Sequence, residues 1–166
     1  MAVTRDLTGI PGPRRISGLR ALLFERLVDE HHPDPQDPAP PPDRLLDREA
    51  LRASIGIELD RLFNTRAPVD AETLDQRRRS TIDYGIPDLS LYSAQDPEAV
   101  AKLAKHLTAA VEIYEPRLDK PKVKVVPDPE RAGKLIAEIA GSLPLGDEVE
   151  SVSFRLVLGG EDDDGQ

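Results

Sequence analysis

A run of prolines divides this chain and limits what its N-terminal part can fold into. Six of the ten residues from Pro33 to Pro42 are proline. Proline lacks a backbone N–H and fixes φ, so this stretch cannot form a helix or a central strand. We expect a semi-rigid, extended linker over residues 32–46 that rises about 3.1 Å per residue. The linker separates a short N-terminal segment from the rest of the chain.

The segment before the linker is predicted to hold a short amphipathic helix. Residues 1–16 are rich in glycine, proline and arginine, which indicates a flexible basic arm. Residues 17–31 follow, with leucines at spacings of three, one and four that predict one apolar helix face. These residues are Leu19, Leu22, Leu23 and Leu27. Such a short helix is not stable alone, so it docks either on a partner or on its own chain. The sequence leaves both alternatives open.

A longer helix is predicted over about residues 47–63. Asp47 is a favourable N-cap, and four apolar residues share one face. These are Leu51, Ile55, Leu59 and Leu62. Gly56 costs about 1 kcal/mol relative to alanine inside a helix, which suggests close packing at that position. The helix is expected to end at residues 64–66, because Pro68 disfavours helical backbone at the residue before it.

The clearest predicted helix spans residues 97–114. Asp96 can cap it, Pro97 suits the first helical position, and Pro116 ends it. An apolar stripe at helical spacing runs along its length. The stripe consists of Val100, Leu103, Ala104, Leu107, Ala110, Val111 and Tyr114. Before this helix, residues 82–90 contain a glycine and a proline and predict an ordered loop.

Strand patterns replace helical patterns after this helix. Residues 122–126 alternate lysine with valine, and residues 149–158 also alternate, so both predict strands. Residues 135–143 fit one face of a helix or one face of a strand equally well. Helices followed by strands predict an α+β fold, with N-terminal helices packed on one side of a small C-terminal antiparallel sheet. We assign this domain to residues 47–160.

Composition excludes several classes of protein. The chain has 22 lysines and arginines against 31 aspartates and glutamates, a net charge of −9, which is the wrong sign for a general nucleic-acid binder. Residues 161–166 form an acidic tail that we expect to be disordered. Cysteine is absent, which excludes disulfides and thiolate chemistry. We find no signal-peptide pattern and no apolar run near the roughly 18–20 residues that span a bilayer, so we expect a cytoplasmic protein.

Few residues follow a pattern typical of catalysis or metal binding. His31, His32 and His106 lack the spacing of a zinc site, and we interpret all three as surface residues. The arginine run at residues 77–79 is interpreted as a solvated face rather than a phosphate site. Gly159 and its neighbouring glycine are not followed by a helix, so they do not form a phosphate loop. We therefore predict no catalytic residue, no metal and no cofactor.

Glu115 is the natural candidate for a general acid in glycoside hydrolysis. That chemistry needs a second carboxylate across a sugar-binding cleft. Such clefts are usually lined by aromatic rings, but the chain has three phenylalanines, three tyrosines and no tryptophan. Arg117 would also hold the carboxyl group ionised, whereas a general acid must carry a proton. Glu115 and Arg117 flank Pro116 where the helix gives way to a strand, and Leu118 can re-enter the core. A weak surface ion pair and an interface anchor both fit this pattern.

Three short motifs stand at the ends of the predicted elements. Residues 54–66 read SIGIELDRLFNTR, residues 84–90 read YGIPDLS, and residues 113–118 read IYEPRL. In this order they resemble the gene-25-like baseplate wedge family, and within it the branch found in type VI secretion systems. The sequence LLFERL at residues 22–27 is similar to the family as well. We single out ten motif residues as candidate interaction sites: Asn64, Thr65, Arg66, Tyr84, Gly85, Pro87, Glu115, Pro116, Arg117 and Leu118.

The resemblance implies a structural, non-enzymatic subunit of a cytoplasmic baseplate docked to a membrane. It implies the wedge partners TssF, TssG and TssK, and a sheet that seeds the TssB–TssC sheath. It also implies that residues 133–143 are a strand. Free sheet edges suit strand addition, and the tethered helix would dock on wedge partners. We further expect Arg117→Ala to leave the protein folded and to block sheath assembly.

Two other functions remain open at the level of sequence. A peptidoglycan glycosidase with Glu115 as its acid requires cell-wall turnover that Glu115→Gln abolishes. A cytoplasmic adaptor or anti-adaptor binding module would use the same fold. It would be distinguished by the identity of its partners.

Overall fold

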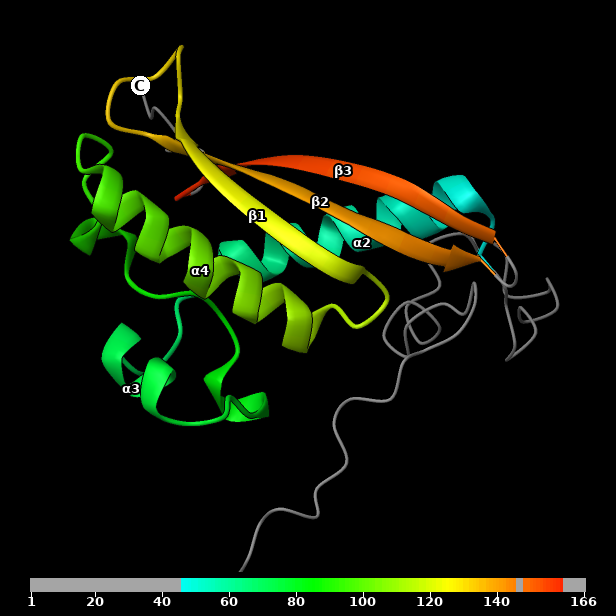
Figure 1. Ribbon diagram of the computed structural model, residues 1–166, viewed down its shortest axis with the longest axis horizontal. Helices are drawn as coiled ribbons and strands as arrows, with labels where there is room; N and C mark the ends of the chain where they lie inside the picture. Colours follow the sequence, from blue (N-terminus) through cyan, green and yellow to red (C-terminus); the bar gives the residue numbers. More distant parts are fainter. Residues whose placement is uncertain (1–45, 146–147, 160–166) are drawn as a thin grey trace, which may run out of the picture.

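The computed structural model describes residues 46–145 and 148–159 (Figure 1). Its helices are α2 (Arg48–Phe63), α3 (Ala71–Gln76) and α4 (Pro97–Tyr114), with 3₁₀ turns η1 (Thr81–Asp83) and η2 (Leu89–Leu91). Its strands are β1 (Asp119–Pro127), β2 (Leu135–Leu145) and β3 (Glu148–Leu158). The expected basic arm (1–16), docking helix (17–31) with its four leucines, acidic tail (161–166), and all of the linker except Leu46 lie outside the described residues.

The three strands form one antiparallel sheet in the order β1-β2-β3. Val123, Ile139 and Phe154 are paired across it. Side chains on this face of the strands join those of α2 and α4 in a single apolar core. The predicted α+β fold, with its helices before a C-terminal antiparallel sheet, is confirmed.

Local signals in the sequence account for both long helices. The side chain of Asp47 accepts a hydrogen bond from the backbone N–H of Ala50 at 2.8 Å, as an N-cap should. At α4, the side chain of Asp96 accepts from the N–H of Glu98 at 2.9 Å, and Pro97 occupies the first turn. The predicted bounds of α4 agree with the structure. Each cap satisfies N–H groups that the helix itself leaves unpaired.

The segment that fits both periodicities is a strand. β2 alternates between buried and exposed positions around Glu138 and Ala140, both of which are exposed. Its core-facing residues are Leu135, Ala137, Ile139 and Leu143. The strand implied by the family resemblance is therefore confirmed, and the helical alternative is wrong. The strand extends through Pro144 to Leu145, two residues beyond the predicted range.

The core is mainly aliphatic, as the low aromatic content predicts. α2 contributes Ile55, Leu59 and Leu62, and α4 contributes Leu103 and Leu107, all fully or almost fully buried. A side chain at Gly56 would meet the ring of Phe154 at 3.8 Å, so the glycine faces the sheet. Within the described part of the chain, none of the helices is long and apolar enough to cross a membrane.

Candidate functional site

Two of the three motifs meet at the C-terminal end of α2. The backbone of Arg66 forms a parallel bridge with that of Ile86. The N–H of Ile86 donates to the carbonyl oxygen of Thr65 at 2.9 Å, and the N–H of Ala67 donates to that of Ile86 at 2.8 Å. Residues 64–66 and 84–90, which are about twenty residues apart in the chain, therefore form one structural unit.

Glycine is required at position 85 of this unit. Gly85 has a φ of +118°, in the region that residues with a side chain rarely adopt. A Cβ atom there would lie 2.5 Å from the carbonyl oxygen of Thr65 and 2.8 Å from the nitrogen of Ala67. The two backbones can approach closely enough to form the bridge because position 85 has no side chain.

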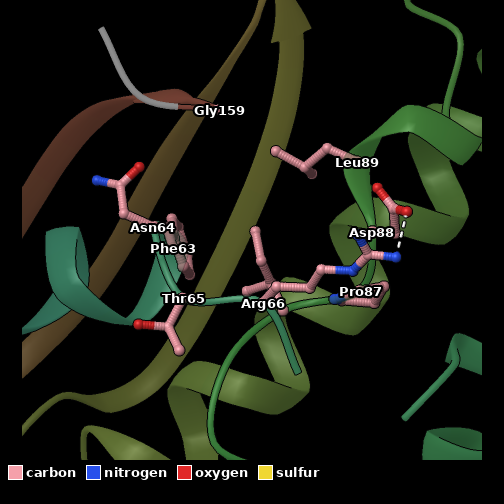
Figure 2. A pocket seen from close by; sticks show the side chains of 9 residues that line it. Phe63, Asn64, Thr65, Arg66, Pro87, Asp88, Leu89 and Gly159 are labelled. Carbon is pink, nitrogen blue, oxygen red and sulfur yellow. Dashed lines mark ion pairs between the residues drawn. The ribbon is translucent and has the colours of Figure 1, made fainter. Parts of the chain in front are cut away.

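An open pocket of about 420 Å³ lies where the two motifs meet (Figure 2). Its lining residues are Phe63, Asn64, Thr65, Arg66, Ile86, Pro87, Asp88, Leu89 and Gly159. Figure 2 shows the side chains of Arg66 and Asp88 meeting at the rim, where Nη2 and Oδ2 are 2.5 Å apart. We call this the Arg66–Asp88 pocket.

Asp88 is held as an anion at this rim. Hydrogen bonds from Ser90 lower its pKa, and the charge of Arg66 lowers it further. The side chain of Arg66 is 72% exposed, so the pair faces solvent. An exposed charged rim beside apolar side chains is suited to recognising another protein.

The third motif forms a buried ion pair. Arg117 donates from Nε and Nη2 to the two carboxylate oxygens of Glu115, at 2.8 and 2.6 Å, and from Nη1 to Ser54 Oγ at 2.7 Å. Glu115 and Arg117 are only 2% and 3% exposed. The alternative of a weak surface ion pair is therefore wrong. The interface-anchor role of this pair remains a prediction.

The chain passes directly from this ion pair into the core. The N–H of Leu118 donates to the carbonyl oxygen of Glu115 at 3.1 Å, which closes a tight turn over Pro116. The side chain of Leu118 is buried against Gly141 of β2, where an added Cβ would lie 2.6 Å from Leu118 Cγ. The motif therefore fixes the angle at which α4 leads into β1.

Tyr84 anchors the second motif to α4. Its ring meets that of Tyr114 edge to face, with the centroids 5.2 Å apart. The hydroxyl of Tyr114 donates to the carbonyl oxygen of Ser80 at 2.7 Å. Burial raises the pKa of Tyr84, with a smaller contribution from Glu58. Both tyrosines therefore serve to hold this loop against the helix.

The interpretation of His106 as a surface residue is wrong. The side chain is 2% exposed, and its Nδ1 lies 3.5 Å from Oδ1 of Asp75. Burial lowers its pKa. His106 follows Leu103 by three residues and precedes Ala110 by four, so helical spacing places it on the buried face. His31 and His32 lie outside the described residues.

The interpretation of the arginine run as a solvated face is wrong for Arg79, whereas Arg77 and Arg78 are exposed. Arg79 is 7% exposed and donates from Nη2 to the carbonyl oxygen of His106 at 3.3 Å. Arg77 forms an ion pair with Asp83, whose side chain is buried. Hydrogen bonds from Ser80 lower the pKa of Asp83, and the charges of Arg77 and Arg79 lower it further. These contacts hold the loop before Tyr84 against α4.

In the part of the chain that the structure describes, no group of three or more histidine, aspartate or glutamate side chains could hold a metal ion. Charged residues of the motifs form ion pairs, at the surface between Glu58 and Arg61 and between Arg66 and Asp88, and in the interior between Glu115 and Arg117. Ser54, the partner that sequence reasoning missed, is the first residue of the first motif.

A family model described as "Baseplate wedge protein gp25" matches residues 49–147, more than half of the chain. The chain belongs to this family. The matched range includes the Arg66–Asp88 pair and the buried Glu115–Arg117 pair. The family resemblance predicted from the motifs is confirmed, and the protein is a baseplate subunit by family.

Among solved structures, a chain of "The baseplate complex from the type VI secretion system" is similar, with a TM-score of 0.47 and 19% sequence identity. The match covers 68% of this chain and 97% of that chain. A comparison with curated proteins finds no match.

Proposed function

We propose that this protein is a TssE-type wedge subunit of a type VI secretion baseplate, without enzymatic activity. It joins the wedge proteins TssF, TssG and TssK and templates the TssB–TssC sheath by strand addition. The observation that carries the proposal is the family match over residues 49–147. The motifs ending in Arg66 and containing Arg117 support the type VI branch.

Strand addition requires a free sheet edge, and β1 is poorly suited to provide one. The N–H of Val123 already donates to Thr108 Oγ1 of α4 at 3.3 Å. β1 also contains Pro121 and Pro127 together with several lysines. Proline and lysine on an edge strand oppose the pairing of a further strand.

β3 offers the better edge. Its eleven residues include no proline, and Val149 near its start is an exposed apolar side chain. A groove of about 680 Å³ runs between β3 and α2, lined by Arg48, Glu49, Arg52, Ala53, Gly56, Glu150, Ser153 and Phe154. Arg52 Nη2 donates to the carbonyl oxygen of Ser153 at 3.3 Å, so this carbonyl points toward the groove. An incoming strand could replace Arg52 there.

The Arg66–Asp88 pocket is a second surface that supports an assembly role. Its exposed ion pair lies beside Leu89, which is partly exposed, and above Phe63, which is buried. We assign this pocket to a wedge partner and the β3 edge to the sheath. The two contacts use opposite ends of α2, so one subunit can hold both at once.

The position of Glu115 supports a non-enzymatic role. Both of its carboxylate oxygens accept hydrogen bonds from Arg117, and the side chain is buried. A general acid in glycoside hydrolysis must reach the glycosidic oxygen of a bound sugar. Glu115 cannot do so without breaking its pair with Arg117.

The first experiment is affinity purification of the tagged chain from its own host, with partners identified by mass spectrometry. We expect wedge and sheath subunits to be recovered together. Recovery of unrelated regulatory proteins, with no wedge or sheath subunit, would instead support an adaptor.

A proline on the β3 edge tests the sheath contact. Ser151 lies two residues before Ser153, so its backbone N–H points to the same edge. We expect Ser151→Pro to fold, to retain wedge partners and to lose sheath assembly, because the incoming strand loses a hydrogen-bond donor. Ser151→Ala is the matched control and should assemble normally. Normal sheaths built on a folded Ser151→Pro protein would exclude β3 as the templating edge.

A further inference from the structure

The face of the sheet turned away from the core carries a basic groove. It has a volume of about 560 Å³ and crosses all three strands. The exposed side chains that line it are Lys122, Lys124, Glu138, Ala140, Ser153 and Arg155. We call this feature the basic groove. Pairing places Lys124, Glu138 and Arg155 in one row across the sheet, with Lys122 two residues along β1.

The charges of the basic groove are not neutralised within the described part of the protein. Three cations surround one carboxylate, on a chain whose net charge is −9. Lys124 and Arg155 flank Glu138 across the strands, yet neither forms an ion pair with it or with another described residue. The groove therefore keeps a positive potential that suits an acidic, extended ligand.

The chain itself supplies such a ligand directly after β3. Residues 161–164 read Glu-Asp-Asp-Asp. The chain leaves β3 at Gly159, whose φ of +93° lies in the left-handed region that favours a reversal of direction.

The lengths of strand and tail agree with a folded-back path. Arg155 lies four residues before Gly159, about 13 Å back along the strand at roughly 3.3 Å per residue. Five further residues reach up to about 17 Å from Gly159. Residues 163 and 164 can thus return as far as Arg155, and residue 164 as far as Lys124.

We propose that the acidic segment at residues 161–164 docks across the basic groove of its own chain. A short tether gives the segment an effective concentration in the millimolar range, which favours it over the same sequence on another molecule. The individual ion pairs are exposed and screened by salt, so the contact is reversible. An acidic segment of a partner protein could then displace the tail. This inference does not depend on the proposed baseplate function.

Zero-length carbodiimide cross-linking tests the docking directly, because it joins a lysine only to a carboxylate in contact with it. The full chain is treated at low protein concentration and the linked peptides are identified by mass spectrometry. We expect links from Lys122 or Lys124 to residues 161–164 that decrease strongly in 0.5 M NaCl. Lys102 and Lys105, exposed on α4, are the internal reference.

Two outcomes would overturn the proposal. One is tail cross-links to Lys122 and Lys124 that are no more frequent than those to Lys102 and Lys105. The other is links that form only between molecules, which an equal mixture of ¹⁴N- and ¹⁵N-labelled chains reveals by mass.

A binding measurement provides an independent check. The tail is neutralised by Glu161→Gln together with Asp162→Asn, Asp163→Asn and Asp164→Asn. A synthetic peptide of residues 159–166 is then added to each protein. We expect it to bind the neutralised variant at least about tenfold more tightly than the intact chain, because the competing tail is gone. Equal binding of the peptide to both proteins contradicts the proposal. So does peptide binding that persists when Lys122→Gln and Lys124→Gln are added to the neutralised variant.

Discussion

Arg117 joins three elements through a single guanidinium group. It contacts Glu115 at the end of α4 and Ser54 on α2, while its own backbone leads into β1. Removing two charges from water costs free energy that their attraction roughly repays, so a buried ion pair adds little net stability. Its value here is geometric, because it fixes how the helix-to-strand turn sits on α2.

Arg117→Ala should be strongly destabilising. It leaves the carboxylate of Glu115 buried without its partner, which typically costs about 3–5 kcal/mol in the free energy of unfolding. Ser54→Ala removes one hydrogen bond and should cost about 1 kcal/mol. Urea unfolding of both variants measures the difference. This prediction differs from the sequence-based expectation that Arg117→Ala leaves the protein folded. A free energy of unfolding within about 1 kcal/mol of that of the original protein would support the earlier expectation and contradict the present one.

Two of the glycines with positive φ, Gly85 and Gly133, give a matched pair of substitutions. A side chain at Gly133 would meet nothing within 4 Å, whereas one at Gly85 would clash with the backbone of Thr65. Gly133→Ala should therefore cost only the conformational strain, about 1–2 kcal/mol. Gly85→Ala should cost clearly more and should separate Arg66 from Ile86. Urea unfolding of both variants checks this order, and equal losses would contradict the clash.

At the scale of elements, α4 was predictable because every local signal agreed. Asp96, Pro97 and the apolar stripe all act within a few residues of one another. β2 was ambiguous because its apolar residues satisfy both periods. What decides its conformation is hydrogen bonding to β1 and β3 on both sides, together with Leu118 packing on Gly141. These are long-range contacts, which a local pattern does not contain.

For the candidate site too, the sequence predicted the local motifs but not the tertiary contacts between them. The motifs identified Arg66 and the loop at Gly85 separately, but the backbone bridge that joins them is a tertiary contact. Spacing along α4 did contain a signal for the burial of His106. Nothing local distinguished Arg79 from its neighbours, because its hydrogen-bond partner on α4 is 27 residues away.

The packing of α3 against α4 should depend on pH through His106. Burial is the main cause that lowers its pKa below the ordinary value of 6.5; Asp75 opposes this, and Arg79, Lys102 and Lys105 reinforce it. The unfolded chain then binds a proton more readily than the folded protein does. The contribution of neutral His106 to the free energy of unfolding is therefore fully present above pH 6.5. It decreases as the pH falls toward the lowered pKa.

Urea unfolding between pH 7.5 and 5.5 measures this dependence. His106→Gln cannot take up the proton, so its stability should change less over the same range. Asp75→Asn removes the negative charge that raises the pKa of His106, so the decline in stability should persist in this variant. An unchanged slope in His106→Gln would show that other groups cause the decline.

At the scale of the whole molecule, one candidate surface stands apart from the other two. The Arg66–Asp88 pocket lies at the C-terminal end of α2, whereas the groove at the β3 edge and the basic groove share Ser153 and Phe154. The core between the surfaces is shared by α2, α4 and the three strands. Substitutions at the Arg66–Asp88 pocket should therefore leave the other two surfaces usable, as a subunit that joins several partners requires.

One variant can decide whether the predicted helix at residues 17–31 docks on a partner or on its own domain. Replacing Leu19, Leu22, Leu23 and Leu27 by serine removes its apolar face. The ten residues of the proline run alone would span roughly 30 Å if extended, so we expect this helix to dock on a partner rather than on its own domain. The variant should then keep its melting temperature and lose wedge subunits in affinity purification. Leu91→Ser, at an exposed position on η2, is the control for an added surface serine.

The opposite result has an equally definite physical meaning. If the four leucines pack on the domain of their own chain, each replacement removes a buried side chain, and truncating a buried leucine costs about 2–5 kcal/mol. Losses of that size exceed the stability of a typical domain, so the variant would unfold instead of merely losing partners. Loss of the cooperative thermal unfolding transition in the leucine variant, with a normal transition in Leu91→Ser, would show that residues 17–31 pack in the core. The linker would then be a loop that leads the helix back to its own domain. Partner proteins would contact the Arg66–Asp88 pocket and the β3 edge alone.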